Sequence, residues 1–362
     1  MELWMYGLGD KPQDNAKTLK EIGFSAVVGG GEANIEAANS NGLDFYHCIG
    51  AYSYSGVFAN EQYLAVDVNG KRQLWFGSTC PTKAVVRAKN IDDAIQKAKQ
   101  QGVTGVFIDG ARFASPASAK SIDAFFTCFC DDCMQKAAGM GFDTKRMHKS
   151  AYELYCLCHG KGNAAKFWET QLPGLTDWFT FRRRATTEHL INFAKAVKSV
   201  DEKLTTGIYI FTPSLSWLVG QNYTDLAPYM DIFSPMIYRR YQASEGPACL
   251  NFELGALYEA LKGASGNVKR TAALLYTLFG FPVSSQTVQE GFPVDAVYSE
   301  VAKTSALVGA DKAYPIIQLD DASLGESIQA CARAGATCVN FFMWNDASME
   351  DAISNGVFSY NE

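Results

Sequence analysis

The sequence predicts an α/β protein: a single (β/α)8 TIM barrel with long loop insertions after its third and fourth strands. Short apolar runs alternate with amphipathic stretches along the chain, which indicates a parallel sheet covered by helices. Eight such runs are found, as many as a closed barrel requires. Acidic residues directly follow two of these runs, in the position where barrel enzymes carry their catalytic groups.

The strands are expected, in chain order, at 2–7, 24–29, 43–49, 103–109, 204–211, 231–238, 312–319 and 336–344. Amphipathic helices fit between most of them, for example at 93–101, 177–199 and 323–334. The segment 251–310 is the most ambiguous, because a strand within its apolar run TAALLYTLFGF would displace one of the eight. Two insertions, at about 50–90 and 113–176, fall on the face where barrel loops build an active site.

The bulk composition fits one catalytic domain over residues 1–362. Hydrophobic residues make up 48% of the chain, and the net charge of -6 without a basic groove makes nucleic acid an unsuitable partner. No run is long enough to span a membrane. The start, MELWMYGLG, lacks the features of a signal peptide. Two compartments stay open: a secreted or periplasmic mature form that has lost its signal peptide, or the cytoplasm.

Acidic residues at two strand ends are the catalytic candidates. Asp109 directly follows the apolar run VTGVFI, so it emerges where the strand leaves the core. YPIIQLDD places Asp320 and Asp321 at the end of the seventh strand, and strand alternation allows only one of them to face the interior. We expect Asp320 to be that one. The competing roles are a helix cap for Asp320 or Asp321, and a loop cap or a pair with Arg112 for Asp109.

The last strand ends in NFFMWND, which places Trp344 and Asn345 at the opening of the barrel. An indole there would form a stacking floor for a sugar, and the amide would bind hydroxyl groups. Asp346 is a third carboxylate candidate. In the alternative reading Trp344 closes the barrel and Asp346 caps a helix. His47, at the end of the third strand, is a weaker substrate-binding candidate, and a buried core histidine is the role that fits it better.

The sixth strand ends in SPMIYRRY, so Tyr238, Arg239, Arg240 and Tyr241 share a loop over the same opening. A buried tyrosine or arginine there would orient a carboxylate and keep it ionised. Arg112, behind the fourth strand, is expected to act in the same way. The alternative is a solvated basic loop.

Cys128, Cys130 and Cys133 lie close enough for three thiolates to converge on one metal ion. A closed structural zinc site needs a fourth ligand, and Cys80 on the preceding insertion is the expected one. A disulfide and free thiols are the alternatives. An ordinary structural role is expected for the other cysteines: Cys48, Cys156, Cys158, Cys249, Cys331 and Cys338.

These motifs together resemble a broad group of predicted TIM-barrel glycoside hydrolases. The resemblance consists of CP at 80–81, DGARF at 109–113 and CFCDDC at 128–133, followed by DIFSPMIYRRY at 231–241 and FFMWND at 341–346. One cysteine followed by CxCxxC is also similar to the zinc site of family-42 β-galactosidases. The resemblance implies a barrel, a carbohydrate substrate and a structural zinc ion.

One departure from family 42 is clear. Those enzymes carry an Asn-Glu pair on strand four and a Glu on strand seven, where this chain has Ile108-Asp109 and the pair Asp320-Asp321. An aspartate on strand four resembles retaining α-glycosidases instead. The sequence therefore predicts a glycoside hydrolase with an aspartate pair, a zinc staple and no organic cofactor.

Two other classes compete with this prediction. One is a carbohydrate-binding barrel that has lost catalysis. The other is a metal-dependent deacetylase or amidase, which the sequence disfavours because its four histidines form neither an HxH nor an HExxH motif.

Overall fold

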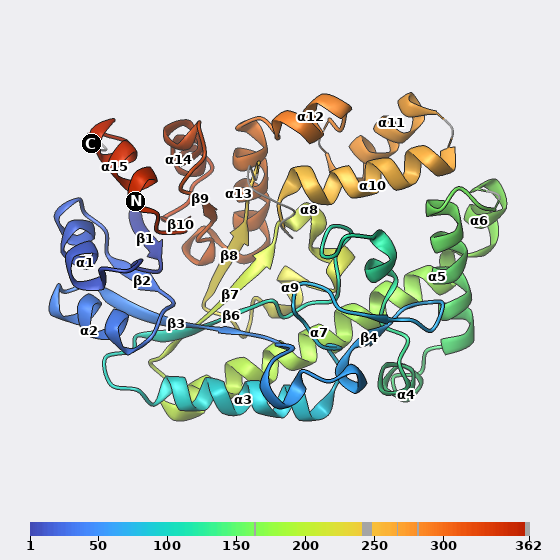
Figure 1. The fold of residues 1–362 in the computed structure, drawn as a ribbon, viewed down its shortest axis with the longest axis horizontal. Helices are drawn as coiled ribbons and strands as arrows, with labels where there is room; N and C mark the ends of the chain where they lie inside the picture. The colour runs from blue at the N-terminus through green and yellow to red at the C-terminus, as the bar shows by residue number, and fades with distance from the viewer. Residues whose placement is uncertain (163, 241–247, 266, 281, 359–362) are drawn as a thin grey trace.

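Eight parallel strands close into a barrel in the computed structural model, which describes residues 1–162, 164–240, 248–265, 267–280 and 282–358 (Figure 1). Their order around the barrel is β1-β10-β9-β8-β7-β6-β3-β2. The strands are β1 Glu2–Tyr6, β2 Ala26–Val28, β3 Asp44–Gly50, β6 Gly105–Asp109, β7 Thr205–Phe211, β8 Ile232–Met236, β9 Ile316–Gln318 and β10 Cys338–Phe342. Each overlaps its predicted segment, so the predicted (β/α)8 fold is confirmed.

Helices cover the outside of this barrel, as the amphipathic stretches predict. They are α1 Pro12–Glu21, α2 Glu32–Ser40, α3 Ala84–Ala98, α7 Leu172–Val200, α8 Pro213–Ser216, α9 Tyr223–Leu226, α13 Asp295–Val308, α14 Leu324–Arg333 and α15 Asp346–Ser354. The predictions for α7 and α14 fall within a few residues of the observed bounds. The helix predicted at 93–101 begins and ends earlier, because α3 starts directly after the first insertion.

The ambiguous segment 251–310 contains helices joined by short loops, and no strand, in its described residues. It contains most of α10 Leu250–Ser265, followed by α11 Val268–Phe279, α12 Ser285–Glu290 and α13. The apolar run is α11, whose buried residues Thr271, Leu275 and Phe279 recur at helical spacing. None of the eight predicted strands is displaced. No helix in the described part of the chain is long and apolar enough to cross a membrane.

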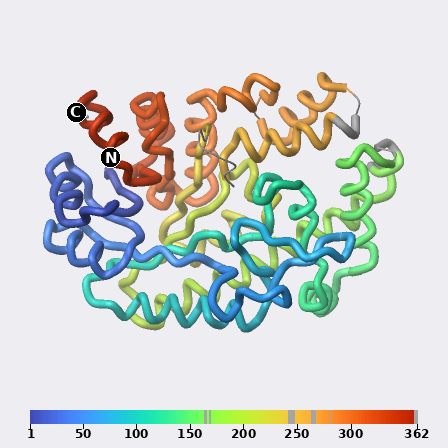
Figure 2. The backbone as a smooth tube through the Cα atoms, in the orientation of Figure 1, coloured from blue at the N-terminus to red at the C-terminus, as the bar shows by residue number. Residues whose placement is uncertain are grey.

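The two insertions pack against each other (Figure 2). The first carries the short helices η1 Gly56–Phe58 and η2 Glu61–Tyr63 and the hairpin β4 Ala65–Val66 and β5 Arg72–Gln73; the second carries η3 Ile122–Phe126, α4 Asp131–Gly139, α5 Thr144–Cys158 and α6 Ala164–Thr170. The Phe129 amide donates to the Val66 carbonyl at 2.8 Å, and Asp67 forms a bridge with Thr127. The remaining short helices are η4 Trp217–Val219 and η5 Ala310–Lys312.

Aromatic side chains fill the barrel interior. Trp4 stacks on Tyr46 with ring centroids 4.6 Å apart, and Phe107 packs against Tyr209 at 5.1 Å. Gly207 makes room for Phe107, because a Cβ at that position would lie 2.4 Å from its ring. These contacts identify the inward face of β1, β3, β6 and β7, and residues two positions further along each strand point the same way.

Candidate functional site

Asp109 is the last residue of β6, at the end of the barrel where the C-termini of the strands lie, here called the mouth. Phe107 faces the interior, so Asp109 does too. Its half-buried carboxylate accepts a hydrogen bond from the Gly110 amide at 2.6 Å. Burial raises the pKa of this carboxyl, against the opposing effects of that hydrogen bond and the positive charge of Arg112. The environment therefore favours the protonated acid.

Neutral polar and aromatic side chains from other strands gather around Asp109. Burial and the Asp109 charge raise the pKa values of Cys48 and Tyr238. At Tyr6 the charge of Cys48, burial and the charge of Asp109 all raise the pKa. The Phe342 ring lies 5.3 Å from both the Tyr6 and the Tyr238 ring. The phenols beside Asp109 are therefore neutral hydrogen-bonding groups at ordinary pH.

Arg112 is buried in an aromatic cage at the same mouth. Its Cζ atom lies 4.8 Å from the Phe211 ring centroid, 5.0 Å from Trp75 and 5.6 Å from Phe76. Burial lowers the pKa of the guanidinium to about 10, although the negative charges of Glu253 and Asp109 oppose this. Arg112 thus stays cationic at neutral pH. Its positive charge lowers the pKa of Asp109, against the effect of burial.

Glu253, in the first turn of α10, is a second buried carboxyl that the sequence reasoning missed. It accepts hydrogen bonds from the Ser115 hydroxyl at 2.7 Å and from the Ala117 and Ala248 amides at 3.0 Å. Burial raises its pKa, opposed by these hydrogen bonds and by Arg112. Glu253 therefore fastens the loop after β6 to the start of α10. An acid in the first turn of a helix is too common to reveal this role from sequence.

The two adjacent aspartates after β9 have different environments. Asp321 accepts two hydrogen bonds from Arg239, at 2.9 and 2.5 Å, and others from the Ser323 amide and the Ser327 hydroxyl. Asp320 is exposed, and its carboxylate makes no hydrogen bond or ion pair with any residue the structure describes. Three effects raise the pKa of Cys249: burial is the largest, followed by the charge of Glu253 and then the charge of Asp320. Asp320 is thus the free carboxylate of the pair.

The candidate residues on the loop after β8 have different environments. Tyr238 is buried against Phe342 inside the mouth. Arg239 is held by Asp321 and by the Phe292 carbonyl. Arg240 is exposed to solvent, and Tyr241 lies outside the described residues.

Trp344, Asn345 and Asp346 lie together where α15 begins. The Trp344 indole donates to the Asp346 carboxylate at 2.7 Å, and its ring packs against Gly9, where a Cβ would lie 2.5 Å from Cδ1. The Asn345 side chain caps α15 by accepting from the Ser348 amide at 3.0 Å. The helix-capping alternative is thus realised by Asn345 instead of Asp346.

His47 does not face the mouth. Tyr46 and Cys48 point into the barrel, so the intervening His47 points toward the outer helices, where its Nε2 lies 2.5 Å from Gln100 Oε1. Burial lowers its pKa. The geometry is that of a satisfied core histidine, which corrects its inclusion among the substrate-binding candidates.

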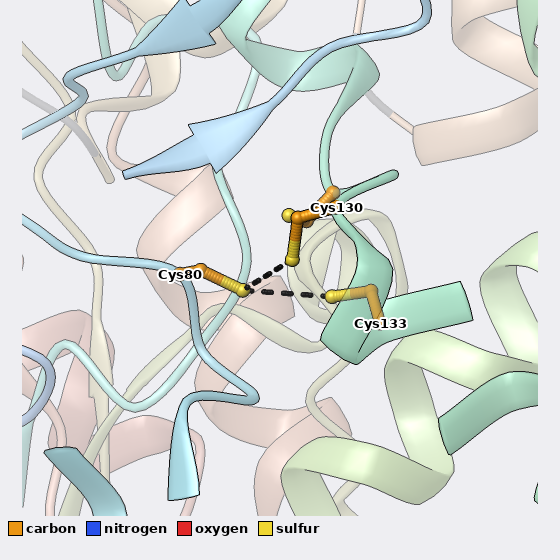
Figure 3. A group of neighbouring side chains, drawn as sticks. Cys80, Cys130 and Cys133 are labelled. Atoms are coloured by element: carbon orange, nitrogen blue, oxygen red, sulfur yellow. Dashed lines mark hydrogen bonds between the residues drawn. The ribbon is translucent and has the colours of Figure 1, made fainter. Parts of the chain in front are cut away.

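Four cysteines converge where the two insertions meet. Cys80, Cys128, Cys130 and Cys133 are all buried, and their sulfur atoms all lie within 4.8 Å of one another. Cys80 Sγ lies 3.5 Å from the sulfurs of both Cys130 and Cys133 (Figure 3). Tetrahedral zinc with Zn–S bonds of about 2.3 Å requires sulfurs about 3.8 Å apart. The donor set and spacing therefore fit such an ion, and none of the four thiols forms a disulfide.

Positive charge borders this cysteine cluster. The buried Arg182 donates to the Thr127 and Leu218 carbonyls at 3.1 and 2.7 Å, and its charge lies near Cys128 and Cys133. The Val66 amide donates to Cys128 Sγ at 3.3 Å. Both interactions favour thiolates, the form in which cysteine binds metal, and they oppose the burial that raises the pKa values of Cys128 and Cys133.

Comparison with known proteins gives a likeness in structure alone. No protein-family model and no curated protein matches the sequence. The PgaB (BpsB) glycoside hydrolase domain from Bordetella bronchiseptica superposes with a TM-score of 0.61 at 11% identity, covering 100% of both chains.

Two β-galactosidases superpose over 95% of this chain. The enzyme from the haloarchaeon Halorubrum lacusprofundi has a TM-score of 0.59 at 12% identity, and that from Marinomonas ef1 has 0.58 at 13%. The chain spans about half the length of each, 53% and 54%. At these identities the likeness establishes a barrel fold that glycoside hydrolases share.

Proposed function

We propose that this protein is a glycoside hydrolase in which Asp109 is the general acid. The observation that carries the proposal is the Asp109 carboxyl itself: it faces the mouth, has a raised pKa and lies among neutral phenols. Glycoside hydrolysis needs one protonated carboxyl to assist the leaving oxygen and one ionised carboxylate on the opposite side of the bond. An acid whose pKa burial raises suits the first role.

Asp320 supplies the ionised carboxylate in this proposal. Asp109 donates its proton to the glycosidic oxygen as the bond to the anomeric carbon breaks, and Asp320 either attacks that carbon or deprotonates the attacking water. Asp321, fully engaged by Arg239 and the turn that follows, positions its neighbour. Arg112 limits the rise of the Asp109 pKa, so that the acid can release its proton.

The substrate contacts belong to the same mouth. Tyr6 and Tyr238 are neutral donors beside Asp109, and Phe342 connects their rings. Trp344 is half-buried and offers an indole face at the end of β10. We assign these side chains to binding of the sugar that is cleaved.

The test compares the native protein with Asp109→Asn on α- and β-linked chromogenic glycosides and oligosaccharides. The expected loss of kcat/KM is about 10²–10⁴-fold, the usual contribution of a general acid. Asp14→Asn, an exposed acid in the first turn of α1, is the matched control and should keep full activity.

Other outcomes separate the competing classes. A fully active Asp109→Asn protein would refute the assignment. Saturable glycan binding without hydrolysis by the native protein would identify a carbohydrate-binding barrel instead. Turnover that chelation abolishes without unfolding would point to a metal-dependent hydrolase.

The cysteine cluster has a separate role in the proposal. Cys80, Cys128, Cys130 and Cys133 would hold one zinc ion in a closed four-thiolate site, which leaves no coordination position for substrate. Such an ion stabilises structure by joining the two insertions. Metal analysis should find about one zinc per native chain and none in Cys130→Ser.

A further inference from the structure

An exposed aromatic ring stands on the first insertion, outside the predicted site. Phe76 is 55% exposed, whereas its neighbour Trp75 is buried. It occupies a tight turn between Trp75 and Ser78, which form an antiparallel bridge closed by a 2.8 Å hydrogen bond from the Ser78 amide to the Trp75 carbonyl. The two residues at the tip, Phe76 and Gly77, have φ angles of 46° and 61°.

Phenylalanine is poorly suited to this position. Two successive positive φ angles define a turn of type I′, which favours Asn, Asp or Gly and disfavours a bulky side chain. Neighbouring chain holds the turn in place: the Phe76 amide donates to the Ser118 carbonyl at 3.0 Å, and the Tyr54 amide donates to the Gly77 carbonyl at 2.7 Å. The surroundings thus enforce a conformation that displays the ring instead of burying it, and strain of this kind concentrates at functional sites.

The ring lies beside Arg112, the buried cation whose charge acts on the proposed catalytic group. The Arg112 Cζ atom is 5.6 Å from the Phe76 ring centroid, and the charge of the same guanidinium acts on Asp109. Phe76 and Asp109 are therefore neighbours of one buried cation. Arg112 occupies one side of the ring, and more than half of the residue is open to solvent.

We propose that Phe76 is a stacking platform for a sugar unit adjacent to the one cleaved at Asp109, so that the substrate is an oligosaccharide. This inference rests on the proposed function. Sugars present apolar C–H faces that stack on aromatic rings, and a rigidly held ring loses little freedom on binding. The other strongly exposed hydrophobic residues of this insertion, Val57 and Leu74, are aliphatic and offer no such face.

The test uses a variant that removes the ring and retains the turn. Phe76→Asn introduces a residue that type I′ turns favour, so its Tm should equal or exceed that of the native protein. Phe76→Trp keeps an aromatic face, and Val57→Asn is the control at another exposed position of the insertion. Each is placed in the Asp109→Asn background. Calorimetry then measures binding of cello-, xylo-, galacto-, manno- and chito-oligosaccharides of one to four units.

The expected result depends on chain length. Phe76→Asn should weaken binding of the preferred oligosaccharide about tenfold, equivalent to ~1.4 kcal/mol, and leave the monosaccharide within about twofold. Phe76→Trp and Val57→Asn should stay within about threefold of the parent. Equal affinities for parent and Phe76→Asn, or an equal loss at every length, would overturn the platform alone. Failure of the parent to bind any series, with no hydrolysis by the native protein, would overturn the proposed function as well.

Discussion

The cysteine cluster and the carboxylates at the mouth were both predicted as sites. In the structure the cysteines come together as one group, whereas the carboxylates have three different environments. The four cysteines converge to within 4.8 Å, as the spacing of three of them indicates. Of the three catalytic candidates, Asp109 faces the mouth, Asp320 is exposed and Asp321 is neutralised by Arg239. Ligands that are close in sequence restrict one another's positions. Residues on separate strands depend on how each loop leaves the barrel.

The largest effect is expected at Asp109, where activity and stability should change in opposite directions. Asp109→Asn should cost about 2.7–5.5 kcal/mol of transition-state stabilisation and yet raise the Tm at pH 7. Because burial raises the folded-state pKa above the unfolded value of about 3.9, the folded protein binds more protons between these two values. The contribution of the protonated Asp109 carboxyl to folding stability is therefore fully present below pH ~3.9 and is lost as the pH rises through the folded-state pKa.

The uncharged Asn does not have this dependence. The Tm difference between the two proteins should vanish near pH 4 and grow as the pH rises through the folded-state pKa of Asp109, as thermal unfolding at a series of pH values would record. A variant that is less stable than the native protein at pH 7 would contradict the assigned environment of Asp109.

Removal of metal should have the next largest effect. Zinc at 1,000 times its Kd contributes about 4 kcal/mol to the folded state. A strong chelator should therefore lower the Tm of the native protein and leave Cys130→Ser, already destabilised, unaffected. Cys156→Ser, a half-buried thiol outside the cluster, should respond to the chelator like the native protein. Equal Tm values with and without chelator in the native protein would argue against a structural ion.

The two adjacent aspartates allow a sharper comparison. Asp321→Asn should lose about 3 kcal/mol in urea unfolding, because it leaves the guanidinium of Arg239 without its charge partner. Asp320→Asn should change stability by less than about 0.5 kcal/mol, as expected for an exposed side chain, and yet lose most activity. The reverse pattern would assign the catalytic role to Asp321.

The smallest effect is expected at Asn345. Asn345→Ala should cost about 1 kcal/mol through loss of the cap on α15, and Asn345→Ser should restore most of it. If Asn345 also binds substrate hydroxyls, kcat/KM of the Ser variant stays low while its stability recovers. If the Ser variant recovers both stability and kcat/KM, Asn345 acts only as a helix cap.

The barrel was predictable because its signals are local. Apolar runs with turn residues at their ends define all eight strands, and the CFCDDC motif locates three of the four clustered thiols. Cys80 was predicted as the fourth ligand that a closed zinc site needs, from its place on the preceding insertion. The ambiguous run TAALLYTLFGF needed its tertiary partners, since a short apolar segment fits a buried strand or a buried helix face equally well.

The missed residues share a different property, because each takes its role from contacts far away in the chain. The carboxylate of Glu253 binds Ser115, 138 residues earlier, and the Phe76 amide donates to the Ser118 carbonyl. Phe76 carries no sequence signal except the following glycine. His47 was a wrong substrate-binding candidate because the side it faces is set by the register of β3, which the sequence alone leaves open.

The pairing of β1 with β10 also constrains how the molecule assembles. Leu3 lies opposite Val339 in the register of these two strands, so barrel closure joins segments that are more than 330 residues apart. The chain loses loop-closure entropy before such long-range contacts can stabilise it, so topologies of this kind fold slowly. On the ribosome, β1 must therefore wait without its partner until almost the whole barrel has been synthesised. The aromatic side chains Trp4 and Tyr6 are the surfaces that a chaperone would have to protect during that interval.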